Sequence, residues 1–403
     1  MTMLGSNTVG ANTQNPWIER HEAVLVGNYG KLPVVLTRGR GSRLWDDAGR
    51  EYLDLFAGFG GTILGHCHPA LVSAITHQAQ TLWAVGNQFY SQPQVQLAER
   101  LRSVAFDGRV FLCHSGAEAA EAAMKLARLA GGPQRTRVIS MHKGFHGRTL
   151  GALSATAGPA QNGFAPLLAG FEHVEFNNIS ALESVMDGTV SAVMVEPIQG
   201  EGGMNMPSPD YLPAVRKLCD RHGATLIFDE VWTGVGRTGQ YFGHQHFGVI
   251  PDIMTMGKAL GGGVPVGGIL ARPAKADFFK PGTHGCTLGG NPICAAVSNA
   301  VFATIEKDGL LEQARESGEL LRNGITAFNC AGLRIKEIRG YGLFLGVELS
   351  IPDAAPVVRH ALANGLVINA TQKNVLRICP SLVISRTEIQ RSLEILEAAI
   401  ESV

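Results

Sequence analysis

Two residues of complementary chemistry follow apolar segments in the middle of the chain. Asp229 comes directly after the run at 224–228 (ATLIF), and Lys258 follows the run at 252–257 (DIMTMG), just before a glycine-rich turn. If both runs are strands of an open α/β sheet, their carboxyl ends line the ligand crevice. The two side chains could then form a structural ion pair, or the amine and the carboxylate could act on one bound molecule.

A third feature suggests an anion site. Ser115, Gly116 and Ala117 lie between a predicted strand and an Ala-rich predicted helix, so backbone N–H groups at the helix start would face an anion. Ser115 with Glu118 also forms a capping box, and capping alone explains the motif equally well. A phosphate site, a lysine and an aspartate together fit pyridoxal phosphate, which needs a lysine for its reactive carbon and an acid for its ring nitrogen.

Three other motifs give weaker evidence for a functional site. The segment GVGRTG at 234–239 matches a dinucleotide fingerprint, but that fingerprint must open a helix, and residues 240–252 have no helical pattern. The triplet His-Cys-His at 66–68 and the pair His142 and His146 lack a third metal ligand at a usual spacing. We therefore predict no metal site, and we interpret these histidines as loop residues at a polar cleft.

Short apolar segments alternate with amphipathic ones through the middle of the chain. The expected strands are 109–115, 137–141, 173–176, 191–197, 224–230, 252–257 and 267–271. Helices are expected between them, as at 117–130 and at 209–223, where Gly223 is a plausible stop. Near-continuous apolar strands separated by helices indicate an α/β fold with a mostly parallel sheet covered on both faces.

The pattern changes after Asn291. Helices are expected at 292–307, 310–328, 354–364 and 386–402, with strands at 333–340, 343–349 and 366–370. We predict an N-terminal arm and part of a small domain in residues 1–60, a large domain in 61–300, and a C-terminal α+β small domain in 301–403.

Composition excludes several classes of protein. The chain has 403 residues, 45% of them hydrophobic and 17% charged, with a formal net charge of zero. This excludes global disorder and gives no support to a nucleic-acid or membrane partner. The polar start has no signal-peptide pattern, and the seven cysteines are scattered without a CxxC pair. Both features favour a cytoplasmic protein with reduced thiols.

At this point the motifs resemble a known family. The chain is similar to the class III, fold-type-I, pyridoxal-phosphate-dependent aminotransferases, and most of all to their acetylornithine and ornithine branch. The resemblance implies a large domain with a mostly parallel seven-stranded sheet and a smaller α+β domain. The stretches that carry it include LGHCHPAL, HSGAEAAEAAMKLAR, KGFHGRTLGALSAT, VMVEPIQGEGG, LIFDEVWTGVGRTG, PDIMTMGKALGGGVPVG and THGCTLGGNP.

The resemblance implies roles around the cofactor. Lys258 would bind it covalently and move protons, and Asp229 would keep its ring nitrogen protonated. The remaining cofactor residues would be Ser115, Gly116 and Ala117 at the phosphate, Phe145 stacked on the ring, Glu196 in support, Trp232 near the phenolic oxygen, and Thr287 at the phosphate of a partner subunit in a homodimer.

On the substrate side, the resemblance implies that Arg148 binds a carboxylate. Arg377 and Glu201 would form a switch: the carboxylate neutralises the arginine when an ω-amino donor binds and moves aside for 2-oxoglutarate or glutamate. Cys286 would reach toward the substrate.

Three residues depart from the branch. Trp232 stands where glutamine is usual, and Cys286 and Leu288 stand where serine and phenylalanine are usual. Indole donates one hydrogen bond and accepts none. These changes line the substrate side, so they bear on the choice of donor.

The expected activity is transfer of the ω-amino group of N-acetylornithine, or a related acylated or free diamino acid, to 2-oxoglutarate by a ping-pong mechanism. The alternatives are another ω-aminotransferase (for 4-aminobutyrate, ornithine, succinylornithine or a diamine) and a non-catalytic protein that binds the cofactor.

Overall fold

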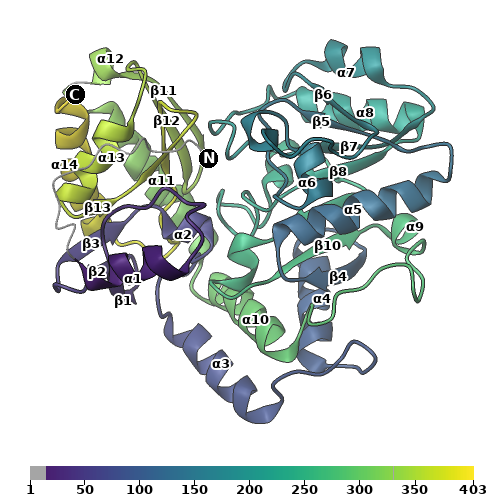
Figure 1. The fold of residues 1–403 in the computed structure, drawn as a ribbon, viewed down its shortest axis with the longest axis horizontal. Helices are drawn as coiled ribbons and strands as arrows, with labels where there is room; N and C mark the ends of the chain where they lie inside the picture. Colours follow the sequence, from purple (N-terminus) through teal and green to yellow (C-terminus); the bar gives the residue numbers. More distant parts are fainter. Residues whose placement is uncertain (1–14, 330) are drawn as a thin grey trace.

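The computed structural model describes residues 15–329 and 331–403, and a seven-stranded sheet forms its centre (Figure 1). The strand order is β4-β10-β9-β8-β7-β5-β6. Only β10 runs antiparallel to its neighbours, β4 and β9. The predicted mostly parallel sheet is confirmed. The bounds are β4 Arg109–Cys113, β5 Arg137–Met141, β6 Phe171–Val174, β7 Val190–Val195, β8 Thr225–Asp229, β9 Ile253–Met256 and β10 Gly267–Ala271.

Both faces of this sheet are buried, which explains why its strands read as continuous apolar runs. On β8, Ile227 packs into the cluster that includes helix α5 (Gly116–Gly131), while Leu226 and Phe228 pack into the opposite cluster with α8 (Tyr211–His222). Helix α8 ends at Gly223, whose φ of 66° is the left-handed conformation that glycine favours. The remaining helices around the sheet are α4 Gln92–Val104, α6 Leu150–Ala155, α7 Ile179–Val185 and α9 Pro273–Ala276.

Two smaller sheets lie beside the central one (Figure 1). The first, β1-β2-β3-β13, joins the two ends of the described chain, because β13 (Leu366–Val367) pairs in parallel with β3 (Glu51–Asp54). Its other strands are β1 Leu36–Arg40 and β2 Arg43–Asp46. The second sheet, β11-β12-β15-β14, consists of β11 Ile335–Tyr341, β12 Phe344–Leu349, β14 Asn369–Thr371 and β15 Val375–Ile378.

The predicted helices after residue 291 are present with small shifts. The strand expected at 366–370 divides into β13 and β14, which belong to different sheets, and a short helix precedes β11. The remaining elements are α1 Pro16–Val24, α2 Ala57–Gly60, α3 Pro69–Thr81, α10 Pro292–Lys307, α11 Leu310–Thr326, α12 Ala331–Arg334, α13 Ala355–Ala363 and α14 Arg386–Glu401, with 3-10 turns at Pro159–Gln161, Gly243–Phe247 and Lys258–Gly261.

Two expectations touch residues that the structure does not describe. Most of the predicted polar arm falls on residues 1–14, and one of the seven cysteines is Cys330; both lie outside the described residues. The domain bounds at 60 and 300 stay a prediction, although the pairing of β13 with β3 is the kind of contact expected if the small domain contains both ends.

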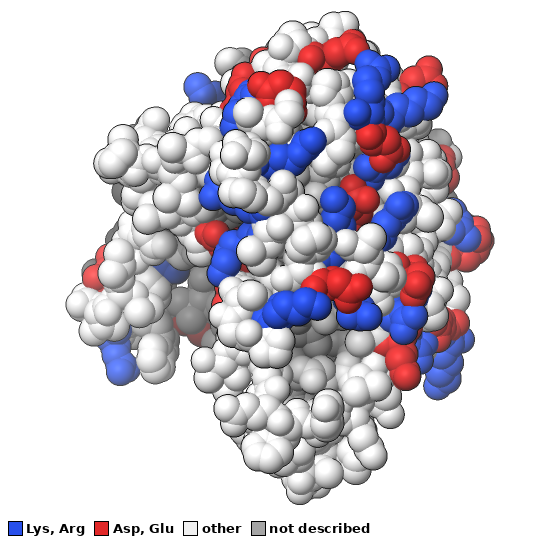
Figure 2. Space-filling view, turned by 90° about the vertical axis from the view of Figure 1, so that its right-hand side faces the viewer, with Lys and Arg blue, Asp and Glu red and all other residues white. Residues whose placement is uncertain are grey.

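Figure 2 shows basic and acidic side chains intermixed on the face that it presents, in keeping with the net charge of zero. Among the described residues, we find no helix with the length and apolar character needed to cross a bilayer.

Candidate functional site

Lys258 lies where β9 gives way to a glycine-rich 3-10 turn, and its φ of 42° is unusual for a residue with a side chain. Burial disfavours the ammonium form and lowers the pKa of Lys258 to about 8, although Glu201 and Asp229 act in the opposite direction. With this pKa about a tenth of the amine is neutral at pH 7, far more than for an ordinary lysine, and the neutral form is what a nucleophilic or proton-accepting lysine needs.

Asp229 ends β8 as predicted and is buried. Its Oδ2 accepts a hydrogen bond from Nδ1 of His146 over 2.7 Å, and its Oδ1 accepts one from the backbone N–H of Val231. Burial alone would lower the pKa of His146, but the hydrogen bond and the charge of Asp229, with a contribution from Glu196, raise it. The hydrogen bond from His146 fixes the orientation of the carboxyl group at the strand end.

His146 is a site residue that sequence reasoning missed. The interpretation as a loop histidine at a polar cleft is right about the loop, but the side chain is buried against Asp229. Its Nε2 is buried without a partner among the described residues. The available signal was its position in the family stretch KGFHGRT, between Phe145 and Arg148.

Glu196 ties two loops together from the end of β7. Its Oε2 accepts from the backbone N–H of Phe145 and its Oε1 from that of Gly200, each over 3.0 Å. Burial raises the pKa of Glu196 to about 7. Glu196 thus fixes the backbone of Phe145, the residue expected to stack on the cofactor, and its supporting role there stays a prediction.

The start of α5 has the geometry both of a helix cap and of an anion site. Ser115 is the N-cap, and its Oγ accepts from the backbone N–H of Glu118 over 3.2 Å. A Cβ on Gly116 would lie 2.8 Å from the Val231 side chain, so only glycine fits there. Capping leaves the N–H groups of Gly116 and Ala117 available, since the first amides of a helix have no partner within it.

Arg377 and Glu201 form a buried ion pair, with 2.8 Å between Nη1 and Oε1. Asn369 accepts a hydrogen bond from Nε of Arg377. Burial alone would raise the pKa of Glu201, but the charges of Arg377 and Lys258 lower it. Both residues line a cavity of about 850 Å³, together with Phe56 and Phe59.

Trp232 fills the space between the predicted cofactor lysine and this ion pair. The centre of its indole lies 4.2 Å from Nζ of Lys258 and 4.3 Å from Cζ of Arg377. The ring stacks on Phe344, and its Nε1 is buried with no partner among the described residues. A Cβ on Gly200 would lie 2.5 Å from the ring, so this loop approaches the indole closely.

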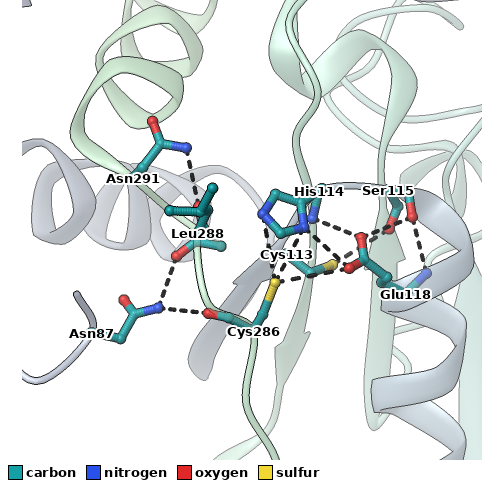
Figure 3. A network of polar contacts seen from close by, with 9 residues as sticks. Asn87, Cys113, His114, Ser115, Glu118, Cys286, Leu288 and Asn291 are labelled. Carbon is teal, nitrogen blue, oxygen red and sulfur yellow. Dashed lines mark hydrogen bonds and ion pairs between the residues drawn. The ribbon is translucent and has the colours of Figure 1, made fainter. Parts of the chain in front are cut away.

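Three other predicted site residues, Arg148, Thr287 and Cys286, are exposed or partly exposed. Arg148 is exposed, 5.5 Å from the Phe145 ring, and donates a hydrogen bond to the carbonyl of Ala160. Thr287 is exposed. Cys286 lies against His114 and Glu118 at the start of α5, and burial raises the pKa of its thiol (Figure 3).

These residues fit pyridoxal phosphate. A buried amine with a lowered pKa and a buried carboxylate held by histidine stand at neighbouring strand ends, since β8 and β9 are paired. The orphaned Nε2 of His146 and the close approach of Gly257 to Gly116 are further features of a site shaped around a bound group.

Comparison with known proteins gives the class. Residues 25–400 match the family model described as aminotransferase class-III, so the chain belongs to the class III aminotransferases. It is an enzyme of the pyridoxal-phosphate-dependent aminotransferase type, and pyridoxal phosphate is its cofactor.

Individual relatives cover nearly the whole chain. It is 46% identical to the acetylornithine aminotransferase of Caldanaerobacter subterraneus subsp. tengcongensis over 94% of this chain and 98% of that protein. It is 42% identical to the acetylornithine aminotransferase of Mycobacterium tuberculosis over 99% of this chain and 98% of that protein. A crystallised ornithine aminotransferase from Toxoplasma gondii, with partial occupancy of the cofactor, matches with a TM-score of 0.92 at 34% identity over 98% and 96%.

Proposed function

We propose that this enzyme transfers the ω-amino group of N-acetylornithine, or of a closely related acylated or free diamino acid, to 2-oxoglutarate, giving a semialdehyde and glutamate. The observation that carries the proposal is the buried pair of Arg377 with Glu201 beside Trp232 and Lys258. The two relatives named above are both acetylornithine aminotransferases, which supports the choice of donor.

The pair meets a specific demand of the reaction. A donor that presents an ω-amino group near Lys258 brings an uncharged methylene chain to the place where a dicarboxylate brings a carboxylate. Glu201 neutralises Arg377 for the first substrate, and Arg377 binds the carboxylate of the second when Glu201 turns away. One site then accepts two different substrates in turn, which is what a ping-pong mechanism requires.

The cofactor, when bound, supplies an electron sink for the carbon that carries the amino group. The chain supplies proton transfer and orientation. Nζ of Lys258, with its lowered pKa, takes the proton from that carbon. Asp229, supported by His146, holds a proton on the ring nitrogen, and Ser115, Gly116 and Ala117 hold the phosphate at the start of α5. Arg148 binds the donor's own carboxylate at the mouth of the site.

A homodimer is part of the proposal. Leu82, Trp83, Phe89 and Tyr90 are exposed on a single chain, and Tyr90 is fully so. Several large exposed apolar side chains within one short segment favour a protein interface. The exposed Thr287 is then free to contact the phosphate in the partner subunit, as proposed from the resemblance. A cytoplasmic location is also proposed, because the described cysteines are unpaired.

The test is a donor panel. The purified enzyme, loaded with pyridoxal phosphate and 2-oxoglutarate, is given N-acetylornithine, N-succinylornithine, ornithine, 4-aminobutyrate and a diamine, and glutamate is measured. The highest kcat/KM with an acylated ornithine supports the proposal. Preference for 4-aminobutyrate or a diamine would favour the alternative ω-aminotransferases, and no glutamate from any ω-amine would refute the function.

A non-catalytic binding protein is the remote alternative. Family membership argues against it. The optical test is direct: a donor should convert the cofactor's absorption band to that of the pyridoxamine form, whereas a silent binder would keep the first band. Replacing Lys258 with alanine should remove the band and the activity together.

A further inference from the structure

Three side chains that bind metals in other proteins converge at the start of α5 (Figure 3). His114 and Glu118 come from the β4–α5 junction, and Cys286 comes from the loop before α10. Nδ1 of His114 lies 3.1 Å from Oε1 of Glu118 and 3.3 Å from Sγ of Cys286. Sγ lies 3.9 Å from the same Oε1, so the three atoms form a compact triangle.

The triangle has the dimensions of one face of a zinc tetrahedron. Bonds of about 2.0–2.1 Å to nitrogen, about 2.0–2.2 Å to oxygen and about 2.3 Å to sulfur give tetrahedral edges of roughly 3.3–3.6 Å between ligand atoms. The nitrogen–oxygen separation of 3.1 Å lies below that range, the nitrogen–sulfur separation of 3.3 Å at its lower end, and the sulfur–oxygen separation of 3.9 Å above it. Sγ also lies 3.8 Å from Nε2 of His114, so a turn of the imidazole that points Nδ1 at the ion, with shifts of a few tenths of an ångström, would seat it and leave the fourth position open.

The chemistry of the donors selects the metal. Imidazole, thiolate and carboxylate together suit Zn²⁺, whereas Mg²⁺ and Ca²⁺ prefer sites made only of oxygen.

The carboxylate of Glu118 is already oriented for this role. Its Oε2 accepts hydrogen bonds from Oγ of Ser115 and from the backbone N–H of His114, each over 3.0 Å. That leaves Oε1 directed at the other two ligands. An ordered outer set of hydrogen bonds that fixes a ligand is typical of metal sites.

Hydrogen bonds also fix the loop that carries the Cys286 thiol. Nδ2 of Asn87 donates to the backbone carbonyls of Cys286 and Gly289 over 2.9 and 3.1 Å. On the single chain the side chains of His114 and Glu118 are 35% and 39% exposed, and in the proposed homodimer the neighbouring Thr287 faces the partner subunit. The site is thus positioned by parts of the chain that are far apart in sequence.

We propose that His114, Glu118 and Cys286 bind one Zn²⁺ with an exchangeable fourth ligand. The zinc–sulfur bond forms as the thiol proton is released to solvent, and no electrons are transferred. The ion would fasten the loop before α10 to the start of α5, next to the residues proposed to hold the cofactor phosphate. This departs from the sequence-based expectation of no metal, which rested on local spacing; these ligands are distant in sequence.

The test uses the holoenzyme, treated with a chelator and then titrated with Zn²⁺ against a chromophoric competitor. We expect one Zn²⁺ per chain, bound at least a hundredfold more weakly by Cys286→Ser and by His114→Gln. Cys67→Ser is the matched control, because Cys67 is exposed between two histidines, and it should bind like the parent. X-ray absorption of the zinc-loaded parent should show one sulfur ligand and lighter atoms.

The result would overturn the proposal if both variants bound Zn²⁺ as tightly as the parent, if the spectrum lacked a sulfur ligand, or if Cys67→Ser alone lost binding. A plain hydrogen-bonded cluster would give no stoichiometric binding at all. If Cys286→Ser fails to fold, His114→Gln and the zinc-dependent rise of the parent's thermal midpoint decide the question, because a protein without the site shows no such rise.

Discussion

Nζ of Lys258 lies 4.2 Å from the centre of the Trp232 indole, and the guanidinium of Arg377 lies 4.3 Å from the same centre. The same ring therefore contacts both the amine proposed to do the chemistry and the cation proposed to bind the second substrate. Indole is the strongest cation–π partner among the side chains, and a buried contact of this kind contributes about 2 kcal/mol.

Trp232→Gln should relax the choice of donor. Because glutamine is smaller than indole, room opens beside Lys258, and kcat/KM for bulkier acylated donors should rise. We expect the ratio of kcat/KM for N-succinylornithine to that for N-acetylornithine to rise by roughly tenfold. Trp232→Phe, which keeps an aromatic ring, should stay near the parent ratio. An unchanged ratio in Trp232→Gln would mean that the indole does not limit the donor.

Glu201→Gln should separate the two half-reactions. The variant leaves the Arg377 charge without a counterion, so we expect kcat/KM for the ω-amino donor to fall at least roughly tenfold, which is about 1.4 kcal/mol. The half-reaction with 2-oxoglutarate should persist with an equal or lower KM. Single-turnover absorbance measures each half. Glu183→Gln, at an exposed pair with Arg221, is the control. Equal losses in both halves would contradict the switch.

Arg148→Ala should act only on donors that carry a carboxylate. The guanidinium is exposed and donates to a backbone carbonyl, so it is available to a substrate. A charge-assisted contact contributes about 1.5–3 kcal/mol, which predicts a KM for N-acetylornithine raised roughly tenfold to a hundredfold. A diamine without a carboxylate should be unaffected. Arg391→Ala, at an exposed helix pair, is the matched control.

The amine of Lys258 predicts how cofactor loading depends on pH. Its pKa is lowered to about 8, so the neutral fraction of this amine rises as the pH passes from about 7 to about 9. The rate at which the apoenzyme takes up pyridoxal phosphate should rise over the same range and level off above it. Stopped-flow absorbance measures this rate. A rate that keeps rising toward pH 10.5, the ordinary lysine value, would refute the lowered pKa.

His146 predicts how stability depends on pH. Its pKa in the folded protein is raised above the ordinary value of 6.5, against the effect of burial and through Asp229. The contribution of His146 to the free energy of unfolding is therefore fully present below about pH 6.5. It is lost as the pH rises through the pKa of His146 in the folded protein. The urea midpoint of the apoenzyme should exceed that of His146→Gln most at about pH 6 and least at about pH 9. A difference that grows with pH would contradict the assignment.

The positions of Asp229 and Lys258 could be predicted because a strand end is visible in sequence: an apolar run stops at a charged residue. The fold class came from the same runs. The antiparallel direction of β10 could not be predicted, since an apolar run has no direction. Nor could the split of 366–370 between two sheets, because that depends on pairing with β3, far away in the chain.

Within the site, the resemblance placed Arg377 and Glu201 together, and the structure has them paired. It did not indicate the partner of Asp229 or the place of the indole. Both depend on side chains meeting across loops, as His146 meets Asp229 and Trp232 meets Gly200. Contacts of that kind leave no periodic trace in sequence.

The pairing of β13 with β3 also has a consequence for synthesis. Every strand of the central sheet, with Lys258 and Asp229, has left the ribosome before β13, β14 and β15 are made. Arg377 lies on β15, so the part of the chain proposed to hold the cofactor can fold before the residue proposed to bind the second substrate has been synthesised.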